Sequence, residues 1–434
     1  MSRITKRKKK KSKSLAKGLF ILLISLLVIL LLFLIFLIVN ISKIDTKTSN
    51  FNENDRKNKV ISSNSRSQDP IKINLSVMGD IMAHNPQLEA QYDVNTNTYD
   101  FNNNFKYVAP YINDADLAIA NLETTLAGPS MPYTSYPTFN SPDTLVDAVK
   151  NAGIDIVSTI NNHSFDKGDL GLERTLKICK EKGLETVGTV ENISDKNYII
   201  KDVSGINVGI TAFSYGNVSN NSKAVNGIEV SNKSKDKMNV FDMVNVNSAF
   251  NTIKKQLDNI KNTDLQIVVL HWGSEYQRTP NKFQVTLAQM LCNYGVDIII
   301  GSHPHVVQPM ELINSYNNDT NTLVIYSLGN FISNQRKELM GSSYTEDGLI
   351  VNIEITKDTQ KNRTFVSKAE CIPTWVNKYQ DLGKMFYEII PIENKTQLKH
   401  IPNLPISSIK QSYNNTKSQI KQSNIINFPY ISFY

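Results

Sequence analysis

Five of the six histidines in this chain follow short apolar runs that have the composition of buried β-strands. These five are His84, His163, His271, His303 and His305. In open α/β sheets, ligands bind in the crevice at the carboxyl ends of the strands. A single histidine there is usually a hydrogen-bonded core residue, whereas five at one edge of a sheet indicate a functional site.

Acidic and amide side chains follow the same strands. They are Asp80, Asn121, Glu123, Asn162, Asp166, Glu275, Gln308, Glu311 and Asn330. Carboxylates together with imidazoles suit Zn, Mn or Fe, and the number of ligands suffices for two ions. Two metals about 3.5–4 Å apart would clamp the oxygens of an in-line displacement at phosphorus. Asp80 or Glu123 could bridge them, and Asp166, Glu275 and Glu311 are placed to accept hydrogen bonds from imidazole N–H groups.

The backbone around these residues carries two further signals. His303 and His305 are two positions apart, so in an extended segment their side chains point to the same side. Glycines stand beside the ligands at positions 79, 273, 301 and 329. Glycine lets the backbone pass close to an ion or a substrate, which agrees with a ligand site at these strand ends.

The strands that would position these residues are short apolar runs. They are Ile71–Met78, Leu117–Ala120, Asp155–Ile160, Ile206–Phe213, Leu265–Leu270, Val296–Ile300 and Leu323–Ser327. Tyr198–Val203 is expected to form a hairpin with the fourth of these strands. Boundary residues such as Ser141-Pro142 and Thr279-Pro280 predict helices at 143–150 and 280–294. Two more helices are expected at 170–182 and 246–262.

Strands that alternate with helices over residues 71–334 predict an α/β domain of mixed sheets. Strand-like runs at Leu349–Ile355, Thr364–Ile372 and Phe386–Pro391 predict that residues 335–392 complete a sheet. Residues 393–434 are rich in Asn, Ser and Lys, and we expect a loosely attached polar tail. The three cysteines are far apart and follow no metal-ligand spacing, so we expect small buried side chains, although one pair could oxidise.

The N-terminus has the features of a membrane anchor. Leu19–Val39 is a run of 21 residues with Ser25 as its one polar member. At 1.5 Å per residue it spans roughly 30 Å, the thickness of a bilayer hydrocarbon core. No small-residue cleavage pattern follows it, which favours a retained transmembrane anchor over a cleaved signal peptide or a buried core helix. The basic tail at 1–18 then stays in the cytoplasm and the remainder lies outside the cell.

Charge and composition exclude several classes of protein. Nine basic residues fall in the first seventeen, and subtracting them from the net charge of +7 leaves −2 for the remainder. The excess positive charge therefore belongs to the tail and indicates no nucleic-acid partner. A hydrophobic content of 40% excludes disorder of the whole chain, and three cysteines exclude a disulfide scaffold. The aperiodic, polar residues 40–70 are predicted to be a flexible linker.

Six motifs in a fixed order carry a family resemblance. They are GDIMAH, NLE, NNHSFD, HWGSE, GSHPHVVQ and SLGNF. This set resembles the bacterial capsule-synthesis family of poly-γ-glutamate biosynthesis proteins, known as CapA or PgsA. That family is in turn similar to the calcineurin-like metallophosphoesterases. The resemblance implies a metallophosphatase-like β-sandwich of mixed sheets flanked by helices, in addition to one N-terminal transmembrane helix.

The second similarity implies roles for individual residues. The implied metal ligands are Asp80, His84, Glu123, Asn162, His271, His303 and His305. His163 would be the acid that protonates the leaving group, with Asp166 and Glu275 as further catalytic residues. Asn121, Gln308, Glu311 and Asn330 would support the ligands or the substrate. Two features depart from the phosphoesterases: three residues instead of one separate Asp80 from His84, and Glu123 replaces the bridging Asp.

Three functions follow as alternatives. The first is a membrane-anchored capsule protein whose extracellular domain, with two divalent ions (Mn, Fe or Zn), handles poly-γ-glutamate or another anionic polymer. It would act in polymer synthesis, export or release, as a hydrolase of the phosphoesterase type, with membrane-bound ligase and export subunits as partners. The second is a stand-alone extracellular dinuclear metallophosphoesterase. The third is a metal-free scaffold that binds polymer.

Two segments beside the motifs permit two interpretations each. Gly128–Pro142 holds four prolines and three aromatic residues and directly follows the second strand end. It either forms a wall or lid over the site or is an ordered surface loop. Trp272 beside His271 could pack in the core or stack on a substrate, and packing is the commoner role for a tryptophan.

Overall fold

The computed structural model describes residues 69–219, 221–317 and 319–433. The basic tail, the predicted anchor Leu19–Val39 and nearly all of the predicted linker lie outside these residues. No helix within the described ranges is long and apolar enough to cross a membrane.

The first of two large sheets contains nine strands within the described residues. In spatial order they are β20 (Lys384–Pro391), β19 (Arg363–Asp381), β18 (Asp347–Asp358), β1 (Ile71–Ile81), β4 (Leu117–Leu122), β5 (Ile156–Ser158) and β6 (Glu185–Val187), with β17 (Asn330–Ile332) paired to β1 and β21 (Ile426–Asn427) paired to β19. β1 runs parallel to β4 and antiparallel to β18, so the sheet is mixed. The register places Asp80 opposite Asn121 on one side and Asn330 on the other.

The second large sheet is also mixed and contains seven strands within the described residues. They are β12 (Val240–Phe241), β8 (Ile206–Tyr215), β13 (Leu265–His271), β14 (Ile298–Ser302), β16 (Asn321–Ile325) and β15 (Met310–Asn314), with β7 (Ile199–Val203) paired to β8. The four central strands run parallel, and β7 and β15 run antiparallel to their neighbours. Two small sheets join β9 (Asn217–Val218), β10 (Lys223–Val225) and β11 (Ile228–Glu229), and β2 (Tyr92–Asp93) with β3 (Thr98–Tyr99).

The two large sheets pack face to face. Their central strands carry apolar side chains on both faces, so one face meets the other sheet and the opposite face meets helices. In β13, Ile267 and Val269 join a core cluster shared with Leu75 of β1, whereas Val268 and Leu270 face the helices beyond. This alternation is the two-residue period of a strand that is buried on both sides. The arrangement confirms the predicted α/β class with mixed sheets.

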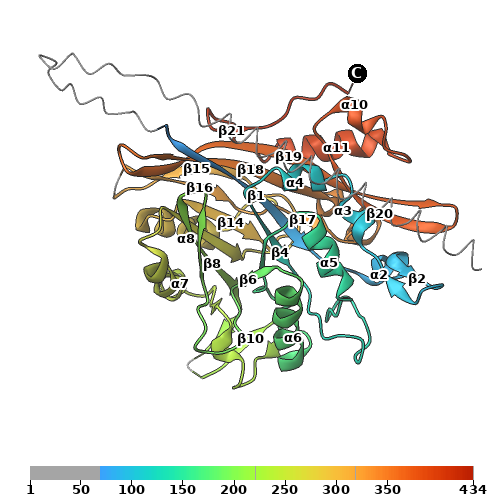
Figure 1. The fold of residues 1–434 in the computed structure, drawn as a ribbon, viewed down its shortest axis with the longest axis horizontal. Coiled ribbons are helices and arrows are strands. Elements are labelled where there is room, and N and C mark those ends of the chain that lie inside the picture. The colour runs from blue at the N-terminus through green and yellow to red at the C-terminus, as the bar shows by residue number, and fades with distance from the viewer. Residues whose placement is uncertain (1–68, 220, 318, 434) are drawn as a thin grey trace, which may run out of the picture. The chain divides into compact units, whose positions relative to one another are not determined.

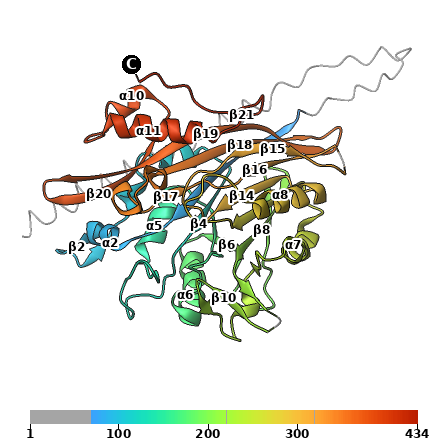
Figure 2. The same cartoon turned by 180° about the vertical axis from the view of Figure 1, so that it is seen from behind.

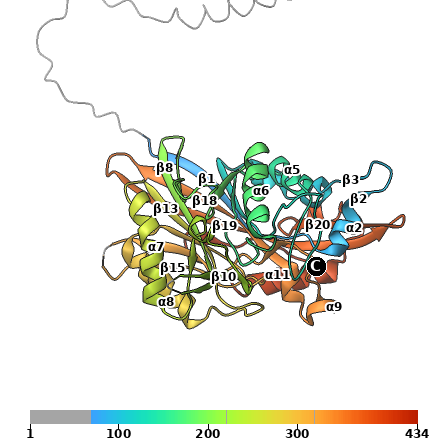
Figure 3. The same cartoon turned by 90° about the horizontal axis from the view of Figure 1, so that it is seen from below.

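Helices flank both sheets (Figures 1 and 2). They are α2 (Asn85–Gln91), α3 (Asn102–Phe105), α4 (Ala109–Asn113), α5 (Thr144–Asn151), α6 (Gly168–Glu181), α7 (Val246–Ile260), α8 (Lys282–Tyr294), α9 (Lys337–Met340), α10 (Lys395–Leu398) and α11 (Ile406–Lys417), together with the 3₁₀ turns η1 (Lys235–Lys237) and η2 (Ser343–Glu346). α7 and α8 pack on the second sheet, and α3 to α6 contribute to a cluster on the first (Figure 3). Helix α8 begins at Asn281, whose side chain accepts from the Gln284 amide, and not at the predicted Thr279-Pro280.

The C-terminal segment is attached to the core, which corrects the expectation of a loose tail after residue 392. Ile409 and Tyr413 of α11 are 0% and 3% exposed and join the cluster that lies between the sheets. The apolar residues were too widely spaced in a polar sequence to reveal this face. The three cysteines are buried and free, as predicted.

Candidate metal centre

The ends of four strands, two from each large sheet, bring predicted site residues together. Asp80 lies in β1, Asn121 in β4, and Glu123 directly follows β4. His271 is the last residue of β13, and His303 follows β14. Because these strands are parallel, their carboxyl ends meet at one edge, as the sequence predicts.

The first group of ligand atoms comes from Asp80, Glu123 and His305, which lie within 4.8 Å of one another. His305 Nδ1 lies 3.1 Å from Asp80 Oδ2, and His305 Nε2 lies 3.7 Å from Glu123 Oε1. All three residues are buried. Burial and the neighbouring Asp80 carboxylate raise the pKa of Glu123 well above its usual value. Two carboxylates buried side by side are unfavourable unless a positive charge or a proton lies between them.

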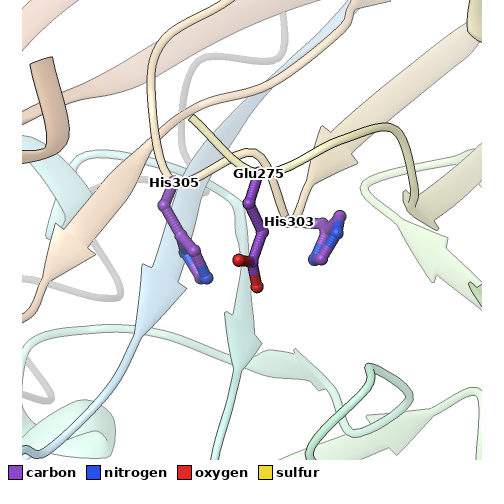
Figure 4. A group of neighbouring side chains, drawn as sticks. All are labelled: Glu275, His303 and His305. Carbon is purple, nitrogen blue, oxygen red and sulfur yellow. The ribbon is translucent and has the colours of Figure 1, made fainter. Parts of the chain in front are cut away.

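The second group consists of Glu275, His303 and His305, again within 4.8 Å of one another. Figure 4 shows the Glu275 carboxylate between the two imidazole rings. Glu275 is exposed, and the two histidines are 3% and 1% exposed. The two groups share His305, so the two candidate positions for a cation are adjacent.

The donor atoms fit a divalent cation. Within the described residues, the buried Glu123 Oε1 and His303 Nδ1 have no hydrogen-bond partner. Native structures rarely leave such atoms unsatisfied, and an ion is one of the ordinary explanations. Burial lowers the pKa values of His271 and His303 well below the usual value. Both rings are therefore neutral, which is the form that binds metal.

The two-histidine turn differs from the extended segment that we predicted. His303 and His305 have φ angles of 97° and 57°, in the left-handed region. A residue other than glycine rarely adopts this region, and such strain occurs mainly at functional sites. The turn nevertheless directs both rings toward Glu275, with the ring centroids 6.0 Å apart. The two side chains share a site because of the turn and not because of strand alternation.

Asn162 and His271 lie beside the first group. His271 Nε2 lies 2.9 Å from Asn162 Oδ1 and 3.5 Å from Glu123 Oε1. The other ring nitrogen, Nδ1, lies 2.9 Å from Ser302 Oγ, which holds the ring in place. Both residues therefore reach the same space as Glu123, as the sequence predicts for metal ligands.

His84 belongs to neither group of ligand atoms. It precedes α2, and its Nδ1 accepts a hydrogen bond of 3.2 Å from the Asn334 amide. Burial lowers its pKa to about 4, and the ring packs edge-on against Phe139. The longer Asp80–His84 spacing carries this histidine past the strand end into the wall of the adjacent cleft.

His163 is oriented by two neighbours that come from different elements. Its Nδ1 lies 2.8 Å from Asp166 Oδ2, and that oxygen also accepts from the Phe139 amide at 2.6 Å. Asn226 Nδ2 donates to Pro137 O at 3.1 Å and to Asp166 Oδ1 at 3.4 Å. Asn226 is not among the site residues that the sequence predicts. The Asn226-Gly227 pair signals a hairpin turn, but nothing in the sequence places that turn over the site.

Two supporting amides contact the ligands as predicted. Asn121 Nδ2 donates to Asp80 Oδ1 at 2.8 Å and to Glu123 Oε2 at 3.1 Å. Asn330 Oδ1 lies 3.1 Å from His305 Nδ1, and its Nδ2 donates to Thr345 O at 2.9 Å. These bonds fix the carboxylates and the shared histidine before any ion binds.

The other two predicted supporting residues do not reach the ligands. Gln308 is buried and bonds to Gln284 and to the carbonyl of Gln277, so it holds the segment after Glu275. Glu311 forms an ion pair with Lys421. The prediction for Glu311 is wrong because β15 runs antiparallel to β16 and leads away from the strand ends.

Two glycines are required by the close approach of strand ends. A Cβ on Gly79 would lie 1.9 Å from the carbonyl oxygen of Gly329, and one on Gly301 would lie 2.0 Å from that of Tyr326. No side chain fits at such distances. These two glycines are therefore required by the packing of backbones around the site, and their predicted approach to an ion or a substrate stays a prediction.

A cleft of about 770 Å³ opens beside the ligand groups. Ser135, Tyr136 and Phe139 line it, so the loop Gly128–Pro142 forms a wall of the site, the first of its two interpretations. Trp272 is fully buried, and its Nε1 donates to Tyr326 O at 3.0 Å. This tryptophan packs in the core and does not stack on a ligand.

Comparisons with known proteins find the same family that the six sequence motifs resemble. Residues 74–335 match the family described as bacterial capsule synthesis protein PGA_cap. The chain is 30% identical over 290 residues to the capsule biosynthesis protein CapA of Bacillus anthracis, covering 65% of this chain and 64% of that protein. It is 27% identical over 266 residues to the PGA biosynthesis protein CapA of Bacillus subtilis (strain 168), covering 58% and 61%. The matches thus span less than two thirds of either relative.

Solved structures give more distant similarities. The calcineurin-like phosphoesterase YfkN from Bacillus subtilis aligns at 16% identity with a TM-score of 0.37, over 80% of this chain and 99% of that chain. The sulfate thiohydrolase SoxB of Thermus thermophilus aligns at 13% identity with a TM-score of 0.33, over 70% and 42%.

Proposed function

Because the chain belongs to the bacterial capsule synthesis protein family PGA_cap, we propose that its folded part is a metal-dependent hydrolase of the phosphoesterase type that acts in capsule biosynthesis. The observation that carries this proposal is the pair of carboxylate and imidazole groups that share His305. In this proposal the site acts while a polymer such as poly-γ-glutamate is made, exported or released.

The residues present would hold two divalent ions of the Mn, Fe or Zn type. Asp80 and Glu123 would hold one, and Glu275, His303 and His305 the other, because the ring of His305 serves one ion at a time. Asn162 and His271 lie close enough to Glu123 to complete the first set. When bound, divalent ions supply Lewis acidity and neutralise charge on a phosphoryl oxygen.

His163 would move the proton that the reaction requires. In hydrolysis, a water oxygen bonds to phosphorus while the ester bond breaks, and the alcohol leaves with a proton. The carboxylate of Asp166, 2.8 Å from His163 Nδ1, accepts a hydrogen bond from that nitrogen and holds the ring in place. Nε2 is then the nitrogen that can donate to the leaving oxygen, and His163 lines the cleft where that oxygen would lie.

The cellular setting is part of the same proposal. Leu19–Val39 would anchor the chain in the cell membrane, with the basic tail inside and the folded part outside. Membrane-bound ligase and export subunits would be its partners. A stand-alone phosphoesterase would need the same site without these partners, whereas a metal-free scaffold would leave the buried Glu123 Oε1 and His303 Nδ1 unexplained.

Metal content of the full chain tests the proposal directly. The chain is purified without chelator and analysed by elemental mass spectrometry, as wild type and as Asp80→Asn, Glu275→Gln and His305→Ala. We expect about two equivalents in the wild type and about one in each variant, because each change removes a ligand of one ion.

His400→Ala is the matched control, since His400 lines a separate depression with Tyr111 and Glu393 and should leave the metal content unchanged. The rate of hydrolysis of bis(4-nitrophenyl) phosphate should fall in proportion to the metal content of each variant. A wild-type chain that binds no Mn, Fe or Zn even after reconstitution would refute the hydrolase and favour the scaffold.

A further inference from the structure

The cleft beside the metal centre contains no lysine or arginine among the described residues that line it. Lys167 is close in sequence to His163, but its Nζ donates to Thr138 Oγ1 at 3.1 Å and it does not line the cleft. Proteins that recognise chains of carboxylates or phosphates use arginine and lysine side chains for that purpose. This cleft therefore lacks the groups that would bind a polyanion along its length.

The fixed charge at the site is negative. Glu275 lines the cleft, Asp80 and Glu123 lie behind it, and Asp166 supports His163. Two divalent ions would carry a charge of +4 against −3 from Glu275, Asp80 and Glu123, which leaves about +1 for one reacting anionic group. Any further carboxylate on the substrate would have neither an ion nor an arginine or lysine side chain of the cleft lining as a partner.

The mouth of the cleft instead presents large apolar and aromatic side chains. Tyr136 is 75% exposed, Leu339 63% and Tyr276 41%, and all three line the cleft. They come from three separate segments: the loop at 128–142, the segment after β13, and α9. Exposed apolar side chains gathered around a polar centre are typical of ligand-binding grooves.

Amide side chains add uncharged polar groups to the lining. Asn85, Asn334 and Gln335 are among the residues that line the cleft. Amides donate and accept hydrogen bonds without adding charge, which suits a neutral polar linkage in a substrate.

We propose that this cleft takes an ester in which one anionic reacting group is joined to an uncharged substituent with apolar surface. Tyr136, Tyr276 and Leu339 are the specificity-determining residues that hold this substituent. The inference rests on the proposed hydrolase function and narrows its substrate class. It excludes a run of carboxylates as the group bound next to the reacting bond.

Two probes with one leaving group test this specificity. The full chain, loaded with Mn, is given 4-nitrophenyl hexyl phosphate and 4-nitrophenyl 5-carboxypentyl phosphate, which differ by one terminal carboxylate. The wild type should prefer the hexyl ester in kcat/KM by about 10-fold, a discrimination of the size that such a pocket supports. Leu339→Lys should abolish or reverse this preference, and Tyr136→Ala should lower kcat/KM for the hexyl ester about 5-fold.

Leu382→Lys provides the matched control, since Leu382 is fully exposed and lies outside this cleft, on the β19–β20 hairpin. That variant should keep the wild-type preference. A wild type that favours the carboxylated ester, or that treats both alike, overturns the inference. The inference also fails if Leu339→Lys and Leu382→Lys behave alike.

Binding of the corresponding hexyl and 5-carboxypentyl phosphonates, measured by calorimetry, separates this inference from the proposed function. If neither ester is hydrolysed, the hydrolase proposal fails, but the ratio of the two phosphonate dissociation constants still decides the specificity. Tighter binding of the hexyl phosphonate supports the inference, and equal or weaker binding refutes it.

Discussion

Burial has opposite effects on the pKa values of an imidazole and of a carboxyl group at the centre. Burial removes the water that would stabilise charge, so the pKa of His303 falls and that of Glu123 rises. A bound cation would offset the free-energy cost of burying ionised Glu123, because the charged carboxylate would then gain a partner. The centre is thus arranged so that its protonation and its metal binding are linked.

Replacing Asp166 tests the role of its carboxylate at the scale of a single residue. Asp166→Asn removes the negative charge beside His163 Nδ1, while the shape of the side chain is kept. We expect kcat for bis(4-nitrophenyl) phosphate to fall about 100-fold, in the range for loss of general acid catalysis. The metal content should not change, because Asp166 belongs to neither ligand group.

Asn226→Ala gives a graded comparison, since it loosens Asp166 and the loop at Pro137 without removing a charge. Its kcat should fall less, by about 5-fold. Loss of metal from Asp166→Asn would assign the carboxylate to the ligands and contradict its role beside His163.

At the scale of elements, the strand ends were predictable and the turns were not. Asp80 and His271 follow from apolar runs, since a parallel strand delivers its last residues to a known edge. Glu275 lies beyond β13. Its carboxylate meets the ring of His303 only because the turn at His303 and His305 has a left-handed backbone. Asn226 reaches the site from a small separate sheet, and only tertiary packing determines that approach.

The dependence on tertiary packing also explains why the prediction of a loosely attached C-terminal tail is wrong. Polar residues predominate in α11, so the segment has a weak amphipathic pattern, and its few apolar residues decide where it packs. Ile409 is fully buried, whereas Ile406 on the same helix is 47% exposed. These two isoleucines therefore form a matched pair for testing whether the helix is part of the core.

Ile409→Ala should lower the free energy of unfolding by about 2–4 kcal/mol, because it removes buried methyl groups and leaves a cavity. Ile406→Ala should change it by less than about 0.5–1 kcal/mol, since the lost surface is half solvated. Urea denaturation followed by fluorescence measures both. Equal, small effects would show that α11 is only loosely attached in solution.

At the scale of the whole molecule, stability should depend on the buried carboxyl of Asp347. Burial raises its pKa to about 7, although Asn415 Nδ2 donates to Asp347 Oδ2 at 2.8 Å. In the unfolded chain this group has an ordinary pKa near 3.9. The folded state therefore binds the proton more tightly, and the stability that this provides is lost as the pH rises from about 4 through 7.

Asp347→Asn should remove this dependence. The free energy of unfolding of the variant, relative to that of the wild type, should rise by about 2 kcal/mol between pH 5 and pH 8. Urea denaturation at the two pH values gives the comparison. A difference that stays constant over this range would show that Asp347 is ionised in the folded protein at both pH values.

The location of the molecule depends on the residues before the folded part. The apolar run Leu19–Val39 and the nine preceding basic charges predict a single-pass anchor with its N-terminus inside. The full chain should sediment with membranes and resist extraction by high salt and by alkaline carbonate. A chain that begins at Ser67 should stay in the supernatant, because it retains the folded unit and lacks the apolar run.

Protease added to intact cells should digest the folded part and spare an N-terminal tag. A cleaved signal peptide would instead remove that tag during export and release the folded part into the medium, and a cytoplasmic domain would resist the protease altogether.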